Sequence, residues 1–206
     1  DLIGARHALN VFVDAAIKCY DIQPHERVLQ FAPLHFDACI EEIFMTLGAG
    51  AHLCIAPEAV KHSFAAFFTF CADHQISLLD LPTAYFNEML FASGGEQTLP
   101  PVVTTVIIGG ESLSPRAKES WFAHYPKGRK LFNSYGPTET TVVATVAEIK
   151  NDGAAVTIGA PLDGIYTAIV GEDLRLLPLG CSGELLIAGA TVSLGYLRSE
   201  EHTSEL

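Results

Sequence analysis

The segment NSYGPTETT, residues 133–141, brings together groups suited to nucleotide chemistry. The flat ring of Tyr135 can stack on a base, and the hydroxyl of Thr138 can donate to a phosphate oxygen. The Glu139 carboxylate offers the hard oxygen ligand that Mg²⁺ prefers. A turn followed by a helix cap is the alternative interpretation, because such strings are common in turns. The whole string favours binding of a nucleotide and a metal ion.

Three carboxylates occupy positions that predict a charged pocket. Asp37 precedes an apolar run with helical spacing, and Glu41 lies one helical turn beyond it on the same face. Asp80 interrupts an otherwise apolar strand-like run. An ionised carboxylate in a partly dry pocket is costly unless it is paired, so a cationic substrate group is the expected partner. Two alternatives stay open: Asp37 can be a helix N-cap, and Glu41 can be solvated like its neighbour Glu42.

The sequence lacks the patterns that are typical of several other kinds of active site. The histidines show no metal-ligand spacing with cysteine or with one another, so we expect no zinc. Ser112 and Ser114 lie in no G-x-S-x-G elbow, which argues against a hydrolase triad. No G-x-G-x-x-G string is present, and Gly109 and Gly110 end a late strand instead of the first, so a dinucleotide fold is disfavoured.

The composition is that of an acidic chain with a sizeable core. Of the 206 residues, 49% are hydrophobic, which is enough to bury a substantial interior. The 24 acidic residues outnumber the 12 basic ones and give a formal charge of −12, which argues against a nucleic-acid partner. Five cysteines without a C-x-x-C pair fit a reducing cytosol, and no apolar run reaches the roughly 18 residues of a membrane span. We expect a cytoplasmic protein that does not enter the membrane.

Helical and strand-like segments alternate along the first two thirds of the chain. Helices are expected at residues 1–20, 37–47, 64–74, 83–92 and 115–125. Strands are expected at residues 27–32, 52–56, 76–81, 102–108 and 130–133. This order predicts an α/β fold with a parallel sheet flanked by helices. Beyond it, short β-rich runs at 144–150, 166–170 and 184–188 predict antiparallel structure in a second layer.

Ligands of open α/β sheets bind beyond the carboxyl ends of the strands. Glycines and carboxylates gather at those ends in this sequence: Phe36 and Asp37, Asp80, Gly109 to Glu111, and Ser134 to Glu139. We expect these residues to form one site.

Four segments together resemble the amino-acid adenylation domains of nonribosomal peptide synthetases, in the adenylate-forming superfamily. The segments are QFAPLHFDACIEEIF, VIIGGESLS, NSYGPTET and GELLIAGATVSLGYL, in the family's order, and the resemblance covers residues 1–197. It implies a portion of the large N-terminal domain, which uses ATP and Mg²⁺ to convert an amino acid to an aminoacyl adenylate. A carrier domain's phosphopantetheine thiol would accept the product, and condensation and carrier domains would be partners in the parent chain. The alternatives are an acyl or aryl acid ligase and a noncatalytic remnant that binds nucleotide or amino acid.

The resemblance also implies roles for individual residues. Thr138 and Glu139 would be catalytic, with Glu139 as the Mg²⁺ ligand. Nucleotide contacts would come from Gly110, Glu111, Asn133, Ser134, Tyr135 and Gly136. The substrate pocket would be lined by Asp37, Ala38, Glu41, Asp80, Ile107, Gly109, Ser134 and Val142. The residue matching Asp37 pairs with the substrate ammonium, and the further carboxylates predict a basic substrate, in the rough order lysine, arginine, ornithine.

Several parts of the family's machinery have no counterpart in this sequence: the phosphate loop ending in Pro-Lys-Gly, the ribose-binding aspartate, the hinge and the catalytic lysine. We therefore expect an internal segment of a longer enzyme, without pyrophosphate exchange of its own. Residues 198–206, RSEEHTSEL, depart from the family and match the translation of a common sequencing-adapter oligonucleotide. They are expected to be non-native, and a natural charged tail is the alternative.

Overall fold

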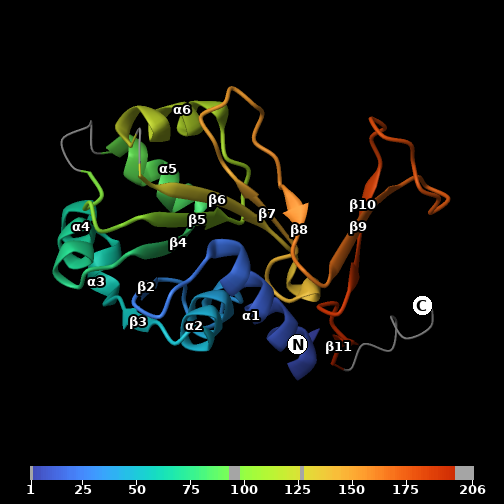
Figure 1. Ribbon diagram of the computed structural model, residues 1–206, viewed down its shortest axis with the longest axis horizontal. Coiled ribbons are helices and arrows are strands. Elements are labelled where there is room, and N and C mark those ends of the chain that lie inside the picture. Colours follow the sequence, from blue (N-terminus) through green and yellow to red (C-terminus); the bar gives the residue numbers. More distant parts are fainter. Residues whose placement is uncertain (1, 93–97, 126–127, 198–206) are drawn as a thin grey trace.

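The computed structural model describes residues 2–92, 98–125 and 128–197, so the expected non-native tail at 198–206 lies outside the described residues. A seven-stranded mixed sheet forms its centre, in the order β3-β2-β4-β5-β6-β7-β8 (Figure 1). The parallel strands are β2 (Arg27–Gln30), β3 (His52–Ile55), β4 (Leu78–Pro82), β5 (Thr105–Gly109) and β6 (Lys130–Tyr135). The antiparallel strands are β7 (Thr145–Glu148) and β8 (Ala160–Pro161). The predicted α/β class with a parallel sheet flanked by helices is confirmed.

The helices cover both faces of this sheet. They are α1 (Arg6–Tyr20), α2 (Ala38–Gly48), α3 (Glu58–Lys61), α4 (Phe64–Asp73), α5 (Thr83–Ala92) and α6 (Pro115–His124), with a 3₁₀ turn η1 (Thr138–Thr140). Figure 1 shows α5 and α6 above the sheet and α1 and α2 below it. Among these described helices, none combines the length and the hydropathy needed to cross a bilayer.

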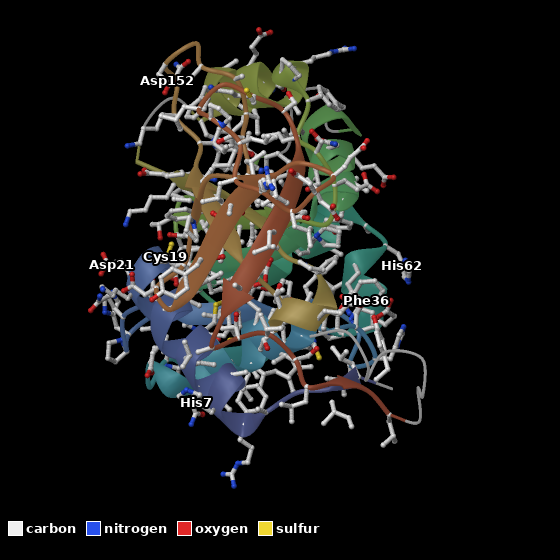
Figure 2. The ribbon with its side chains drawn as sticks, turned by 90° about the vertical axis from the view of Figure 1, so that its right-hand side faces the viewer. His7, Cys19, Asp21, Phe36, His62 and Asp152 are labelled. Carbon is white, nitrogen blue, oxygen red and sulfur yellow. The ribbon has the colours of Figure 1, made fainter. Side chains whose placement is uncertain are left out.

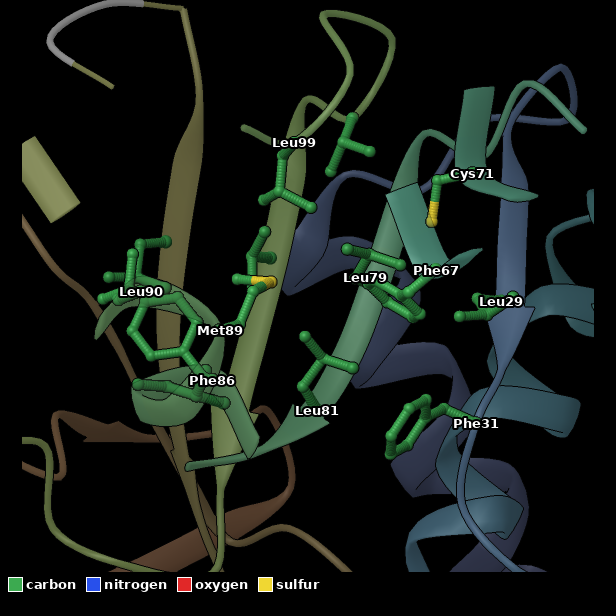
Figure 3. Packing of buried hydrophobic residues seen from close by; sticks show 14 of the residues in the cluster. Leu29, Phe31, Phe67, Cys71, Leu79, Leu81, Phe86, Met89, Leu90 and Leu99 are labelled. Carbon is green, nitrogen blue, oxygen red and sulfur yellow. The ribbon is translucent and has the colours of Figure 1, made fainter. Parts of the chain in front are cut away.

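Side-chain alternation along the strands divides the core into two clusters, one on each face of the sheet. In β4, Leu79 and Leu81 pack with Phe67 and Phe86 from the helices on one side (Figure 3). Leu78 belongs to the opposite cluster, with residues of α1 and α2. Asp80 is two residues beyond Leu78 in the strand, so its side chain points to the same face of the sheet, the one that α1 and α2 cover.

The β-rich runs after Val142 are antiparallel strands as predicted, but they do not all lie in a second layer. The first run, β7, pairs with β6 and extends the main sheet. The other two, β9 (Ile165–Val170) and β10 (Glu184–Gly189), form a separate two-stranded ribbon in the foreground of Figure 2. The chain passes from β6 through η1 to β7, and pairing of consecutive strands is the shortest connection.

The two ends of the described chain meet in a short antiparallel pair. The expected helix at residues 1–20 begins only at Arg6, and β1 (Leu2–Ile3) precedes it. This strand pairs with β11 (Gly195–Tyr196). The pairing brings Tyr196 into the same region as η1, where Ser193 N–H donates to the carbonyl of Glu139.

Candidate active site

A cavity of about 580 Å³ opens beyond the carboxyl ends of the parallel strands. The register aligns these ends, since Pro82 of β4 lies opposite Gly109 of β5. The predicted site residues that line the cavity are Asp37, Ala38, Glu41, Asp80, Gly109, Gly110, Glu111, Ser134, Gly136, Thr138 and Val142. Phe36 also lines it and is exposed at the surface (Figure 2). The structure therefore brings these strand-end residues together around one cavity.

Asp37 stands at the N-terminal end of α2 but does not cap that helix. Its backbone has helical dihedral angles, and its side chain makes no capping hydrogen bond. Its carboxylate instead accepts a hydrogen bond from the hydroxyl of Thr138. This contact joins α2 to η1 across the cavity, and both polar groups are available to a ligand there.

Glu41 and Glu42 are both buried, so neither is a solvated helix residue. Glu41 is 2% exposed, and its Oε1 accepts a hydrogen bond of 2.9 Å from the hydroxyl of Tyr20 in α1. Burial raises the pKa of Glu41 to about 7, and the negative charges of Glu42 and Asp37 act in the same direction. The hydrogen bond from Tyr20 opposes this shift because it stabilises the charged form.

Glu42 anchors the loop that follows β2. Its carboxylate accepts hydrogen bonds of 2.9 Å from the backbone N–H groups of Phe31 and Ala32, and one of 3.2 Å from the side chain of Gln30. Burial is the largest cause that raises its pKa to about 7. These bonds satisfy backbone donors at the strand end, which gives Glu42 a structural role beside the cavity that it also lines.

Asp80 is a buried carboxylate with one oxygen left unpaired. The side chain is 8% exposed, and its Oδ2 has no hydrogen-bond partner within the described structure. Burial raises its pKa well above the usual value, and the charges of Glu41 and Glu42 add to this. A buried acceptor without a partner costs free energy, so a ligand that supplies a donor or a positive charge gains affinity here.

The three buried carboxylates predict an unusual dependence of stability on pH. Their folded pKa values lie above the unfolded ones, so the folded chain binds more protons than the unfolded chain between about pH 4.5 and 7. The stabilisation is fully present below the unfolded pKa values and is lost as the pH rises through the folded ones. We expect the free energy of unfolding of the 206-residue chain, measured in urea, to be lower at pH 8 than at pH 5.

Variants isolate the contribution of one carboxylate to this pH dependence. Asp80→Asn removes a buried charge, so it should reduce the fall in stability between pH 5 and pH 8. Asp73→Asn, at the exposed C-terminal end of α4, should leave the fall unchanged. If the free energy of unfolding depended on pH equally in wild type and in Asp80→Asn, then Asp80 would not be a buried charge in the ligand-free chain.

The glycine turn after β5 is held close to β6. A Cβ atom at Gly109 would lie 2.6 Å from the Ser134 Oγ, and Gly110 has a φ of +86° that favours glycine. The hydroxyl of Thr83 donates to the carbonyls of Gly109 and Glu111, at 3.0 and 3.2 Å. The turn is therefore fixed from two sides, by Ser134 and by Thr83.

Four predicted site residues do not line the cavity. Ile107 is fully buried in the core that α1 and α2 cover, although its register partner Asp80 lines the cavity. Asn133 is buried, and its side-chain amide donates to the carbonyl of Thr157 at 2.8 Å. Tyr135 is 40% exposed at the end of β6. Glu139 lies beside the cavity on η1 and accepts a hydrogen bond from Tyr196, which lowers its pKa.

Further residues contribute to the site although the sequence did not single them out. Val143 lines the cavity next to Val142, after a backbone kink in which Thr141 and Val142 have φ values of 61° and 69°. Such values are rare for non-glycine residues and rarer still for β-branched ones. Thr83 and Tyr20 act through hydrogen bonds made across the fold, which no local sequence pattern signals.

The fold and the cavity have counterparts among known proteins. The family profile described as AMP-binding enzyme matches residues 4–197, and the chain belongs to this family. In solved structures, the N-terminal subdomain of NpsA from Klebsiella oxytoca, in complex with 3-hydroxybenzoyl-AMSN, superposes with a TM-score of 0.82 and 27% identity. That match covers 95% of this chain and 48% of the NpsA chain.

Curated relatives assign the chain within the family to the adenylation domains of nonribosomal peptide synthetases. It is 45% identical over 179 residues to the isonitrile lipopeptide synthase of Streptomyces coeruleorubidus, covering 85% of this chain and 12% of that protein. It is 31% identical over 192 residues to tyrocidine synthase 1 of Brevibacillus parabrevis, covering 90% of this chain and 16% of that protein. The chain thus spans less than a fifth of the length of either relative.

Proposed function

We propose that this chain forms the amino-acid-selecting part of an adenylation domain whose substrate is a basic amino acid, with lysine preferred over arginine and ornithine. The observation that supports the substrate class is the unpaired Oδ2 of Asp80 in a cavity that Glu41 also lines. A neutral side chain would leave both carboxylates buried without a counter-charge, whereas an ammonium or guanidinium group would pair with them.

The residues of the cavity suit a reaction in which an amino-acid carboxylate oxygen attacks the α-phosphorus of ATP and pyrophosphate leaves. Asp37 would bind the α-ammonium group, which places the substrate carboxylate toward Thr138. The Thr138 hydroxyl, which donates to Asp37 in the ligand-free chain, would donate to a phosphate oxygen instead. Tyr135, partly exposed at the end of β6, would stack on adenine. Positioning by these groups supplies most of what the chain contributes to the rate.

The donor set beside the cavity is compatible with Mg²⁺ held mainly by the nucleotide. Within the described ranges, no group of three or more His, Cys, Asp or Glu residues could form a metal cage. Mg²⁺ typically binds one or two carboxylates together with substrate phosphates and water, and Glu139 offers one such carboxylate. The ion would neutralise charge that develops on the phosphates. The hydrogen bond from Tyr196 favours the charged form of Glu139 that such a role needs.

The acceptor of the activated amino acid is proposed to be the phosphopantetheine thiol of a carrier domain, with condensation domains as further partners in the parent protein. The support comes from relatives: one solved match is an artificially fused adenylation and PCP di-domain, NpsA-ThdA, which has a TM-score of 0.82 to this chain. It is 26% identical and covers 95% of this chain and 36% of that one.

An aryl acid substrate is the second candidate, because NpsA is described in complex with 3-hydroxybenzoyl-AMSN. An aryl acid without an amino group would give no counter-charge to Asp37, Glu41 or Asp80. These three cavity carboxylates would then have no cation beside them, at a cost in free energy for each one that stays ionised. The electrostatics of this cavity therefore favour the amino acid.

Pyrophosphate exchange across a panel of acids tests the proposal. The sample is a completed domain, in which residues 4–197 replace the matching segment of the tyrocidine synthase 1 adenylation domain. We expect lysine, arginine or ornithine to give the highest kcat/KM, with leucine and phenylalanine lower by about two to four powers of ten, since an unpaired buried charge costs about 3 to 5 kcal/mol. A preference for an aliphatic, aromatic or aryl acid would refute the basic-substrate assignment.

A further inference from the structure

A tyrosine from outside the cavity bonds to one of the cavity's carboxylates. Tyr20 is the last residue of α1, and its hydroxyl donates to Oε1 of Glu41 at 2.9 Å. The side chain is 2% exposed, and its ring meets that of Phe132 edge to face, with 5.2 Å between the centroids. Tyr20 itself does not line the cavity, whereas Glu41 does.

Core packing does not account for the hydroxyl. A phenylalanine would make the same edge-to-face contact with Phe132 and would bury no polar group. A buried tyrosine hydroxyl needs a hydrogen-bond partner, and the partner here is a carboxylate that faces a ligand cavity. The hydrogen bond fixes the rotation of that carboxylate, because it engages one named oxygen from a rigid helix end.

We propose that Tyr20 is a positioning residue for substrate selection, whose hydroxyl holds the Glu41 carboxylate in the orientation that receives the cationic end of the substrate side chain. The inference rests on the proposed basic substrate. It adds a residue of α1 to the determinants of specificity, although that residue makes no contact with the substrate.

The surroundings of Glu41 explain why it needs a donor. The titratable groups that face it are Asp37 and Glu42 on its own helix, Asp80 on β4, and Cys19 and Tyr20 on α1. All of these groups are acidic, so none offers a positive charge to Glu41. The hydroxyl of Tyr20 lowers the pKa of Glu41 against this background and against burial, and its removal would make ionisation harder.

The test replaces Tyr20 by phenylalanine in the completed domain and compares lysine with norleucine, which has the α-ammonium group but lacks the ammonium group of the side chain. We expect Tyr20→Phe to lower the ratio of kcat/KM for lysine over norleucine by about ten- to a hundredfold, the range for a hydrogen bond to a charged group. The kcat/KM for norleucine and the KM for ATP should stay unchanged. Tyr85→Phe is the matched control, because it removes a buried hydroxyl that has no hydrogen-bond partner among the residues the structure describes and does not line the cavity.

Two further measurements separate positioning from a general structural defect. The loss of lysine activity in Tyr20→Phe should shrink as the pH rises, because Glu41 then ionises without the donor. In a Glu41→Gln background, Tyr20→Phe should change the lysine to norleucine ratio no further. An equal loss for both substrates at every pH, or an unchanged ratio in Tyr20→Phe, would overturn the inference while the basic preference of the wild type stands. A wild type that does not prefer lysine would overturn the proposed function and this inference together.

Discussion

Glu41→Gln and Asp80→Asn should each lower the kcat/KM of the completed domain for lysine by about two to four powers of ten. Both side chains are buried beside one cavity, and removing one partner of a buried charge pair costs about 3 to 5 kcal/mol. We expect the selectivity to change, because a neutral substrate offers no counter-charge to these carboxylates and each variant removes one of them. The kcat/KM for norleucine should therefore stay constant or rise.

The double variant, Glu41→Gln with Asp80→Asn, should prefer a neutral amino acid over lysine. Glu119→Gln serves as the control, because Glu119 is exposed on α6 and does not line the cavity. The measurement is amino-acid-dependent pyrophosphate exchange with melting curves recorded for each variant. Unchanged lysine activity in both single variants would show that these carboxylates do not meet the substrate side chain.

Glu139→Gln should reduce pyrophosphate exchange by at least about a hundredfold with every amino acid. The substitution keeps the size of the side chain but removes the charge next to the proposed nucleotide site, and charge stabilisation through a bound metal ion amounts to several kcal/mol. The half-saturating Mg²⁺ concentration should rise in the same variant. Selectivity among amino acids should not change, because Glu139 does not line the cavity that we propose to hold the amino acid.

An exposed glutamate in the loop after β9 provides the comparison for this variant. Glu172→Gln removes the same charge far along the sequence from η1 and should leave both the rate and the Mg²⁺ requirement unchanged. If Glu139→Gln kept the wild-type rate and the wild-type Mg²⁺ dependence, the metal-binding assignment would have to be abandoned.

The parallel part of the sheet could be predicted because each apolar strand is followed by a segment of helical period. The same order placed Asp37, Gly109 and Thr138 at strand ends, and the cavity lies where that prediction put them. Local pattern could not identify the sheet to which β7 belongs, since antiparallel strands have the same alternation whether they extend one sheet or begin another.

Tertiary contacts account for most of what the sequence did not reveal. The helical period marks Tyr20 as a core residue, but it carries no information on the distance from its hydroxyl to Glu41. Ile107 was assigned to the pocket by its position in a motif, but its side chain packs into the core that α1 and α2 cover. Glu41 and Glu42 are the same residue type in neighbouring positions, so the sequence could not separate their roles. Glu42 has its own role because the backbone N–H of Phe31 comes within hydrogen-bond distance of its carboxylate.

The left-handed kink at Thr141 and Val142 bears on how such a pocket changes its substrate over evolutionary time. A left-handed conformation costs a non-glycine residue on the order of 1 to 3 kcal/mol, and Val142 is β-branched. Replacement by glycine or asparagine would relieve part of that strain while it widens the cavity. Replacing Glu41 on α2 by a smaller apolar residue, by contrast, would leave the buried hydroxyl of Tyr20 without its acceptor. Divergence toward larger substrates therefore meets least resistance at the kink.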